Sequence, residues 1–277
     1  MKLNRILLFF FSLLLFGSCN EKGKSLTDKD SKKAKEKFHL YILMGQSNMA
    51  GRGKVQSIDT LVHPRVYMLD KEQNWVLAKD PMHFDKPVAG VGLGLTFGKI
   101  MANENSEIKI GLIPTAVGGS SINAWFADSI HSQTNSYPYN DMIKRANKAL
   151  AEGTLKGILW HQGESDTRTE TDVKEYPAKF NAMIDSLKAD LSIATVPIVM
   201  GELGHFFYPK SPNAENLNTV FEEMAKSNPC LALVSANGLN HKGDSTHFDS
   251  DSYHALGARY AAKMIELQKS CSMEVEK

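Results

Sequence analysis

The sequence has few cysteines, no excess of charge of either sign, and no apolar run long enough to span a bilayer comfortably. Its 32 Lys and Arg residues nearly balance its 31 Asp and Glu residues, so no whole-chain field attracts nucleic acid or another polyanion. We therefore expect a small or neutral ligand. Cys230 and Cys271 stand in no supporting pattern, and such cysteines are more often free thiols than a disulfide. The sequence alone leaves their pairing open.

The amino terminus has the layout of an exported bacterial lipoprotein. Lys2 and Arg5 precede an apolar segment, residues 6–16, and small residues then lead directly to Cys19. This junction resembles a lipobox, with Phe16 at the position where leucine is usual. We expect residues 1–18 to be removed as a signal peptide and Cys19 to hold the lipid that anchors the protein to a membrane. The sequence does not tell which membrane face this is.

The remainder divides into a tether, one domain and a short tail. Residues 19–37 are almost entirely Lys, Glu, Asp, Ser, Gly and Thr, which bury too little apolar surface to offset the entropy of ordering. We therefore expect a flexible tether there. Residues 38–270 form the domain, with no repeat or Pro/Gly linker inside it, and residues 271–277 form the tail.

Within the domain, short apolar runs alternate with amphipathic runs at helical spacing. The expected strands are residues 38–44, 108–113, 157–160, 196–200 and 231–234. The expected helices are about residues 92–103, 139–152, 173–190, 214–226 and 252–269. This alternation predicts an α/β fold in which a mostly parallel five-stranded sheet lies in a three-layer α/β/α arrangement.

Two long loops, residues 52–91 and 115–138, begin at strand ends and are expected to form the walls of a pocket. Residues 66–69 and 75–77 in the first loop could instead form an extra hairpin. The sequence does not decide this point.

A polar stretch, Gly45-Gln-Ser-Asn48, directly follows the first predicted strand. In open α/β sheets, ligands bind at the carboxyl ends of the strands, so Ser47 is a candidate nucleophile. The alternative is a serine that caps the following helix. Nothing within the stretch decides between the two interpretations.

Two further polar clusters follow later strands. Gly118-Gly119 after the second strand lets the backbone approach a ligand, although an ordinary tight turn would look the same. His161, Gln162 and Glu164 follow the third strand, where the alternative is a structural network beneath the loops.

A last cluster precedes the final helix. Asp244 and His247 are three residues apart, a spacing that lets the carboxylate accept the imidazole Nδ1 proton while Nε2 faces outward. A serine nucleophile needs a base oriented in this way. Asp249 and His254 lie nearby and are interpreted as capping or surface residues.

Taken in order, these blocks resemble the SGNH hydrolase superfamily. They are similar, more narrowly, to the carbohydrate-esterase branch that contains sialate O-acetylesterases and family 6 acetylxylan esterases. The matching blocks are Gly45-Gln-Ser-Asn48, Gly118-Gly-Ser-Ser-Ile-Asn-Ala-Trp125, His161-Gln-Gly-Glu164 and Asp244-x-x-His247. The resemblance spans about residues 38–268 and implies a flavodoxin-like SGNH fold. Met49 replaces the last glycine of G-x-S-x-G, which argues against an ordinary α/β-hydrolase.

The resemblance also implies roles for individual residues. Ser47 would be the nucleophile, His247 the base and Asp244 its orienting partner. The oxyanion hole would use the backbone N–H groups of Ser47 and Gly119 and the amide of Gln162, where the superfamily normally has Asn. Weaker substrate-binding or supporting roles are implied for Gln46, Asn48, Gly118, Trp125, His161 and Glu164. The implied reaction removes O-acetyl groups from a carbohydrate through an acetyl-serine, without cofactor or metal. The glycan itself is not specified.

Two other functions remain as alternatives. A metal-dependent hydrolase would use as ligands His241, Asp244, His247 and Asp249. It would leave Ser47 without a role. A non-catalytic glycan-binding lipoprotein would stack sugar rings on Trp75, Trp125 or Trp160. Such a protein has no need of an intact Ser, Asp and His set.

Overall fold

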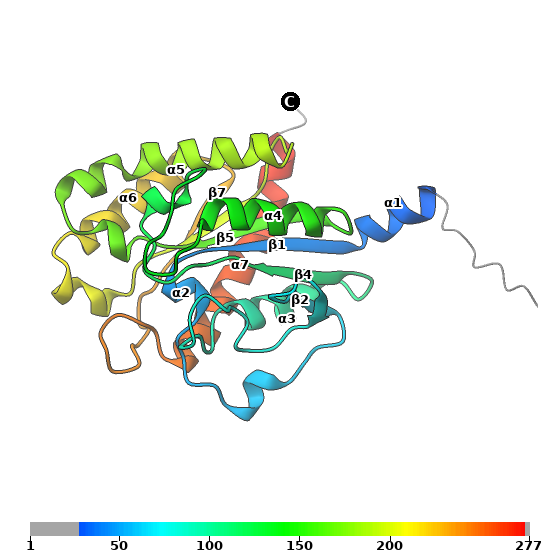
Figure 1. Ribbon diagram of the computed structural model, residues 1–277, viewed down its shortest axis with the longest axis horizontal. Helices are drawn as coiled ribbons and strands as arrows, with labels where there is room; N and C mark the ends of the chain where they lie inside the picture. Colours follow the sequence, from blue (N-terminus) through cyan, green and yellow to red (C-terminus); the bar gives the residue numbers. More distant parts are fainter. Residues whose placement is uncertain (1–27, 275–277) are drawn as a thin grey trace, which may run out of the picture.

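The structure is a computed structural model that describes residues 28–274, in which one sheet lies between two layers of helices (Figure 1). The seven strands run in the order β3-β2-β4-β1-β5-β6-β7, and only the β2–β3 pair is antiparallel. Their bounds are β1 Phe38–Gly45, β2 Val66–Leu69, β3 Trp75–Leu77, β4 Lys109–Pro114, β5 Thr154–His161, β6 Ile198–Gly201 and β7 Leu231–Val234.

The predicted α/β fold is confirmed, but the count of five strands is wrong. The five expected strands are β1, β4, β5, β6 and β7, and the hairpin that the sequence left undecided supplies β2 and β3. These two strands have only four and three residues. So short a segment shows too little periodicity to be recognised without its neighbours.

Strand β1 occupies the centre of the sheet because both of its faces are apolar. Leu40, Ile42 and Met44 enter the core on one side of the sheet, whereas Tyr41 and Leu43 enter the core on the other. All five side chains are fully buried. A strand covered on both faces reads as a continuous apolar run, as in parallel sheets.

Five long helices cover the two faces. Apolar side chains of α4 (Pro138–Leu150), α5 (Glu170–Asp190) and α6 (Ala214–Ser227) fill one core. Those of α3 (Gly94–Glu104) and α7 (Ser250–Glu274) fill the other. In the view of Figure 1, α4 and α5 lie above the strands and α3 lies below them. This is the expected three-layer arrangement.

Short elements connect these layers. Two are the helices α1 (Asp28–Glu36) and α2 (Ser47–Ala50). The others are the 3₁₀ turns η1 (Ser57–Thr60), η2 (Ile122–Trp125), η3 (Glu164–Asp166) and η4 (His205–Lys210). No helix among residues 28–274 is both long and apolar enough to cross a membrane.

Residues 19–37 were expected to form a flexible tether, but the second half of this segment is helical. Asp28–Glu36 form helix α1, in which lysine, alanine and glutamate are good helix formers. Its last turn contacts the domain, because the Thr154 hydroxyl donates to the Lys35 carbonyl at 3.1 Å. The signal peptide, Cys19 and the first part of the tether lie outside the described residues.

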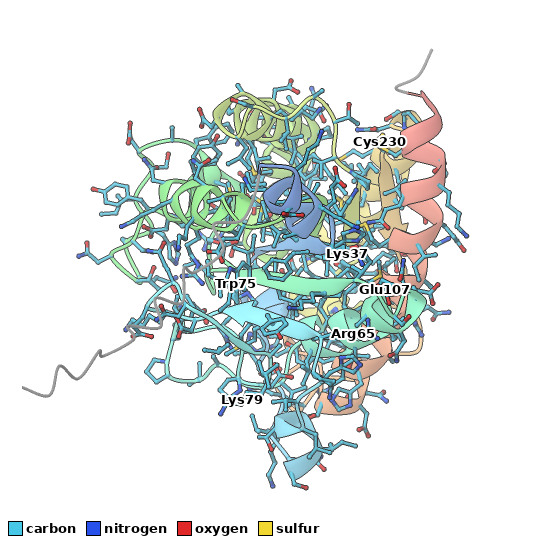
Figure 2. The ribbon with its side chains drawn as sticks, turned by 90° about the vertical axis from the view of Figure 1, so that its right-hand side faces the viewer. Lys37, Arg65, Trp75, Lys79, Glu107 and Cys230 are labelled. Atoms are coloured by element: carbon cyan, nitrogen blue, oxygen red, sulfur yellow. A yellow bond between two sulfur atoms is a disulfide. The ribbon has the colours of Figure 1, made fainter. Side chains whose placement is uncertain are left out.

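The preference for free thiols is also wrong. Cys230, just before β7, forms a disulfide with Cys271, and their Cα atoms are 4.9 Å apart. Figure 2 shows Cys230 beside α7. The two residues are 41 positions apart, so their proximity depends on how α7 packs against β7. The expected tail, residues 271–277, therefore begins inside this helix.

The topology places one crevice at the carboxyl end of β1. From β1 the chain first builds β2, β3 and β4 on one side, then crosses to form β5, β6 and β7 on the other. In such sheets the ligand crevice lies where the strand order reverses, outside the carboxyl ends of the strands. The loops after β1, β4, β5 and β7 hold the four predicted polar clusters.

Candidate active site

A glycine at the end of β1 brings the candidate nucleophile to the crevice. Gly45 has φ +134°, and a Cβ there would lie 2.1 Å from the carbonyl oxygen of His161 on β5. Only glycine fits so close to the neighbouring strand. The next residue, Gln46, donates its N–H to the same carbonyl at 2.9 Å. Ser47 then begins α2 and is 7% exposed.

The structure brings Ser47, His247 and Asp244 together. The Ser47 Oγ lies 3.0 Å from His247 Nε2, and His247 Nδ1 lies 2.7 Å from Asp244 Oδ2. The other carboxylate oxygen accepts the backbone N–H groups of Thr246 at 2.9 Å and His247 at 2.8 Å. These bonds fix the carboxylate before it orients the imidazole. The arrangement can deprotonate a serine hydroxyl.

The protonation states suit this role. Burial disfavours the charged imidazole and lowers the pKa of His247, and this effect outweighs the opposing attraction of Asp244. Burial would raise the pKa of Asp244, but hydrogen bonds from His247 and Thr246 lower it well below its usual range. Near neutral pH the imidazole is therefore free to accept a proton, and the carboxylate is charged.

Two backbone N–H groups are candidates for stabilising an oxyanion. Neither Ser47 nor Gly119 donates its N–H to an acceptor elsewhere in residues 28–274. Gly119 has φ +87°, a conformation that favours glycine. The neighbouring Gly118 instead donates its N–H to Asp85 Oδ2 at 2.8 Å. Gly118 thus holds the loop, and Gly119 retains a free donor.

The side chain of Gln162 does not take the place expected for it in the oxyanion hole. It is fully buried, and its Oε1 accepts the Tyr176 hydroxyl proton at 2.7 Å. Its amide nitrogen lies within hydrogen-bond distance of Gln46 Oε1, the Ser120 carbonyl and Asp166 Oδ2. Since an amide has two N–H groups, none is left for a ligand. Gln162 supports the loops from below.

Gln46, directly after β1, and Asp166, after β5, belong to the same buried network as Gln162. Gln46 Oε1 accepts N–H groups of Gly163 at 3.4 Å and Ser165 at 3.3 Å. Asp166 accepts the backbone N–H of Ile122, which begins η2. Burial raises the pKa of Asp166 to about 6. Together these bonds join the loops that follow β1, β4 and β5.

Asn48 is the most connected of the weaker candidates. Its Nδ2 donates to Glu164 Oε1 and, at 3.0 Å, to the carbonyl of Thr246. Its Oδ1 accepts the hydroxyl proton of Tyr253 at 2.7 Å and the backbone N–H of Phe248 at 3.3 Å. Thr246 and Phe248 flank His247, so Asn48 holds the backbone on both sides of the base.

Two other candidates are core residues and do not reach the site. The Trp125 indole is fully buried, donates to Ser120 Oγ at 3.1 Å and packs edge-on against Trp160. His161 is fully buried as well, and its Nδ1 lies 3.0 Å from the Tyr260 hydroxyl. Burial lowers the pKa of His161 to about 3, which keeps the ring neutral. Both residues stabilise the sheet beneath the crevice.

The tryptophans cannot form a stacking surface at the crevice. Trp125 and Trp160 are both fully buried. Trp75 packs edge-on against Phe38 at the start of β1, and Ser47 follows the other end of that strand. The tryptophan side chains on which the glycan-binding alternative depends are therefore not available for sugar stacking at this site.

The proposed metal cluster is not assembled either. His241 Nδ1 accepts the backbone N–H groups of Gly243 and Ser245, both at 3.0 Å. Asp249 Oδ1 accepts the Ser252 N–H at the start of α7, which is the expected capping role. Within the described part of the chain, no group of three or more His, Cys, Asp or Glu side chains could hold a metal ion.

One buried ion pair beside the crevice was missed. Arg52 follows α2 and lies 2.6 Å from Asp85, and both side chains are almost fully buried. Asp85 is the residue that accepts the Gly118 N–H. A Cβ on Gly118 would come within 2.3 Å of the guanidinium, so this glycine is also a packing requirement. Nothing in the sequence around Asp85 marks it as a partner of Arg52.

The structure thus places a Ser-His-Asp set at the carboxyl edge of a mostly parallel sheet that is covered on both faces, an arrangement that serine hydrolases use. A family model described as "Carbohydrate esterase, sialic acid-specific acetylesterase" matches residues 37–266. The chain belongs to this family, and the predicted family is confirmed.

Known proteins agree with this assignment. The chain is 30% identical to a probable carbohydrate esterase of Arabidopsis thaliana over 80% of its own length and 88% of that protein. A crystal structure of an Arabidopsis thaliana protein is similar with a TM-score of 0.73 and 28% identity, covering 82% of this chain and 98% of the other.

Two more distant structures share the fold. NanS aligns with a TM-score of 0.70 and 17% identity, covering 85% of this chain and 99% of that chain. A carbohydrate acetylesterase from Xanthomonas citri aligns with a TM-score of 0.63 and 19% identity, covering 80% of this chain and 55% of the other. The chain thus belongs to a carbohydrate esterase family and shares the fold of these two structures.

Proposed function

We propose that the protein is a serine esterase that removes O-acetyl groups from a carbohydrate through an acetyl-serine intermediate. The single observation that supports this most directly is the contact chain from Ser47 through His247 to Asp244, at 3.0 and 2.7 Å. The family description and the acetylesterase from Xanthomonas citri favour acetyl as the acyl group. The free N–H groups of Ser47 and Gly119 provide the matching oxyanion donors.

The proposed reaction has two halves. Ser47 Oγ attacks the acetyl carbonyl carbon while His247 Nε2 takes the hydroxyl proton, and the N–H groups of Ser47 and Gly119 bind the oxyanion. The C–O bond to the sugar then breaks, and His247 returns the proton to the departing sugar oxygen. In the second half, His247 deprotonates a water that attacks the acetyl-serine, the bond between the carbonyl carbon and Ser47 Oγ breaks, and His247 returns the proton to Oγ as acetate leaves. Each oxyanion donor contributes roughly 10²- to 10³-fold in kcat.

Acetate release by the mature protein and by Ser47→Ala tests the assignment. A panel of acetylated glycans should identify at least one substrate, and Ser47→Ala should abolish its hydrolysis. Ser186→Ala is the control, because this exposed serine lies on α5 and bonds only to its own helix. Activity of Ser47→Ala near the level of the unaltered protein would show that another residue is the nucleophile.

The proposed location is a membrane surface outside the cytoplasm, with the lipid on Cys19. The Cys230–Cys271 disulfide supports export, since disulfides persist in oxidising compartments. In Figure 1, α1 lies at the opposite end of β1 from α2. The lipid on Cys19 would precede α1 in the chain. Cys19→Ser should move the protein from the membrane fraction to the soluble fraction; if it stays with the membrane, the anchor lies elsewhere.

A further inference from the structure

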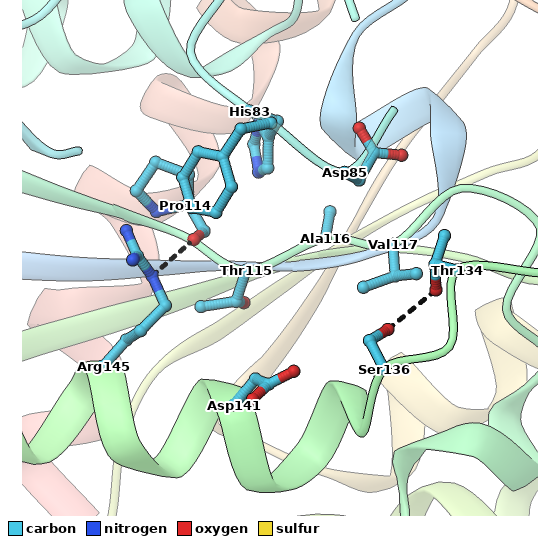
Figure 3. A pocket seen from close by; sticks show the side chains of 11 residues that line it. His83, Asp85, Pro114, Thr115, Ala116, Val117, Thr134, Ser136, Asp141 and Arg145 are labelled. Carbon is cyan, nitrogen blue, oxygen red and sulfur yellow. Dashed lines mark hydrogen bonds between the residues drawn. The ribbon is translucent and has the colours of Figure 1, made fainter. Parts of the chain in front are cut away.

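A pocket of about 220 Å³ lies between Asp85, residues 114–117 and α4 (Figure 3). Its floor is Pro114, the last residue of β4, together with residues 115–117, and one side comes from α4. The other sides come from residues 83–85 and from Thr134 and Ser136. These segments belong to the two long loops that the sequence predicted as pocket walls. None of the catalytic roles assigned above uses this pocket.

The pocket shares a wall with the oxyanion loop. Asp85 lines it and binds the Gly118 N–H at 2.8 Å, one residue before the free donor of Gly119. The partner of Asp85, Arg52, also donates to the carbonyl of Gly51, the residue that ends α2. A carbonyl bound between Ser47 and Gly119 would therefore lie beside this wall. One of the two groups on that carbonyl carbon could reach the pocket past Asp85 and Gly118.

The size of the pocket selects between those two groups. Ligand pockets typically enclose roughly 300–1,000 Å³, so this smaller pocket suits one ring better than a chain. An acetyl methyl group would leave most of it empty. The sugar ring that bears the ester is the group of suitable size.

The polar and aromatic lining suits a sugar ring. The hydroxyls of Thr134 and Ser136 lie 2.7 Å apart and hydrogen-bond each other, which leaves one O–H donor and free oxygen lone pairs for a ligand. Phe84 lines the same pocket and is 41% exposed, although Arg145 packs over its ring at 4.7 Å. Sugar rings use their polar edges for hydrogen bonds and their apolar C–H faces for packing on aromatic rings. The pocket offers both kinds of contact.

The charges around the pocket favour an uncharged ring. Asp85 is neutralised by Arg52. The buried Arg145 donates to the Pro114 carbonyl at 3.0 Å and is attracted by Asp70 and Asp141. His83 is buried, and burial lowers its pKa to about 4, so the imidazole is neutral. The pocket has no surplus cation for a sugar carboxylate.

We propose that this pocket is the subsite for the leaving group, and that it accepts a single uncharged pyranose ring bearing the acetyl ester. The inference rests on the proposed function for the direction of the ester. It names Phe84, Thr134 and Ser136 as residues that determine specificity, and none of them touches the reacting atoms.

A matched pair of substrates tests the charge preference. The pair consists of a monoacetylated methyl glucoside and the corresponding methyl glucuronoside, which differ only in the carboxylate at C6. Ethyl acetate, whose leaving group is too small to fill the pocket, is the reference ester. Acetate release gives kcat/KM for all three. The unaltered protein should prefer the glucoside over the glucuronoside by at least about tenfold, and the opposite preference overturns the uncharged class.

Two substitutions test the pocket itself. Ser136→Phe fills it, and the ratio of kcat/KM for the glucoside to that for ethyl acetate should fall by at least about tenfold. Phe84→Ala removes the aromatic face and should lower the same ratio by about three- to tenfold, the range of an aromatic contact. Val88→Ala is the control, because Val88 is 64% exposed on the same loop and does not line the pocket. An unchanged ratio in Ser136→Phe overturns the proposal.

Failure of the proposed function has a different signature. In that case the unaltered protein releases no acetate from any of the three esters. The pocket is then tested by saturation-transfer NMR with unacetylated methyl glucoside and Ser47→Ala. Binding to Ser47→Ala that disappears when Ser136→Phe is added supports the subsite. Binding that survives this addition, or that does not occur at all, contradicts it.

Discussion

Asn48 connects the buried carboxylate of Glu164 to the loop that holds His247. One side of its amide contacts Glu164 Oε1, and the same side chain binds the carbonyl of Thr246 and the N–H of Phe248. The residue that follows the nucleophile therefore positions the base, although Ser47 and His247 are 200 positions apart in the chain. The fully buried side chain of Asn48 thus connects the loop around His247 to the segment that contains Ser47.

Asn48→Ala should lower kcat more than it raises KM. The loop on both sides of His247 loses its support, and small misplacements of catalytic groups cost on the order of 10²-fold in rate. The buried Glu164 also loses its donor, which should cost about 1–3 kcal/mol of stability. Steady-state kinetics on a small acetate ester and thermal unfolding check both effects. Asn181→Ala on the exposed side of α5 is the control; equal kinetics of the two variants would refute the positioning role.

The pH dependence of kcat/KM should report the lowered pKa of His247. Burial lowers this pKa from its usual value near 6.5, and only the neutral imidazole can take the serine proton. Activity should therefore be full at neutral pH and should fall only below pH 6.5. A pH series in a constant-ionic-strength buffer measures the acid limb. A midpoint above 6.5 would show that a different group controls this limb.

Glu164→Gln should stabilise the protein at alkaline pH. Burial raises the pKa of Glu164 from 4.5 to about 7, and its Oε2 has no hydrogen-bond partner in the described residues. The folded state therefore holds this proton more tightly than the unfolded state does. The resulting stability is complete below pH 4.5 and is lost as pH rises through about 7. The neutral Gln avoids this loss.

The difference in Tm between Glu164→Gln and the unaltered protein isolates this contribution from that of other titrating groups. The variant should gain a few degrees between pH 5 and pH 8, on the scale of about 2–4 °C per kcal/mol for a domain of this size. A difference that stays constant over this interval would mean that Glu164 does not titrate within it.

Reducing the Cys230–Cys271 disulfide should destabilise the fold without abolishing catalysis. The bond joins the start of β7 to the last turns of α7, far along the helix from its beginning at Ser250 near the site. Removing a native disulfide typically costs about 2–4 kcal/mol. The double variant Cys230→Ser and Cys271→Ser should melt at a lower temperature and keep its kcat at 25 °C. Equal melting temperatures under oxidising and reducing conditions would show that the bond adds no stability.

How much could be predicted from the sequence depends on whether a feature is local. Strand β1 was recognisable because apolar residues on both faces form a continuous run, and Asp244 and His247 meet because they are three residues apart. Gln162 was misplaced because its rotamer depends on Tyr176 and Asp166, which no motif connects to an oxyanion. The disulfide and the Arg52–Asp85 pair depend on how distant elements pack, so the sequence pattern contained no signal for either.

The Arg52–Asp85 pair should be required for both stability and catalysis. Asp85→Ala leaves a guanidinium buried without its counter-ion, a change that typically costs about 3–5 kcal/mol. It also removes the acceptor of the Gly118 N–H, so the loop that presents Gly119 loses its anchor. The Tm of thermal unfolding and the kcat for ethyl acetate should both fall.

A second variant separates the two effects. Replacing a buried ion pair by apolar residues is often neutral for stability, so Arg52→Met combined with Asp85→Leu should restore much of the lost Tm. It cannot restore the acceptor for Gly118, and kcat should remain at least about tenfold below that of the unaltered protein. If kcat recovers together with Tm, Asp85 acts only through stability, and the anchoring of the oxyanion loop must come from other contacts.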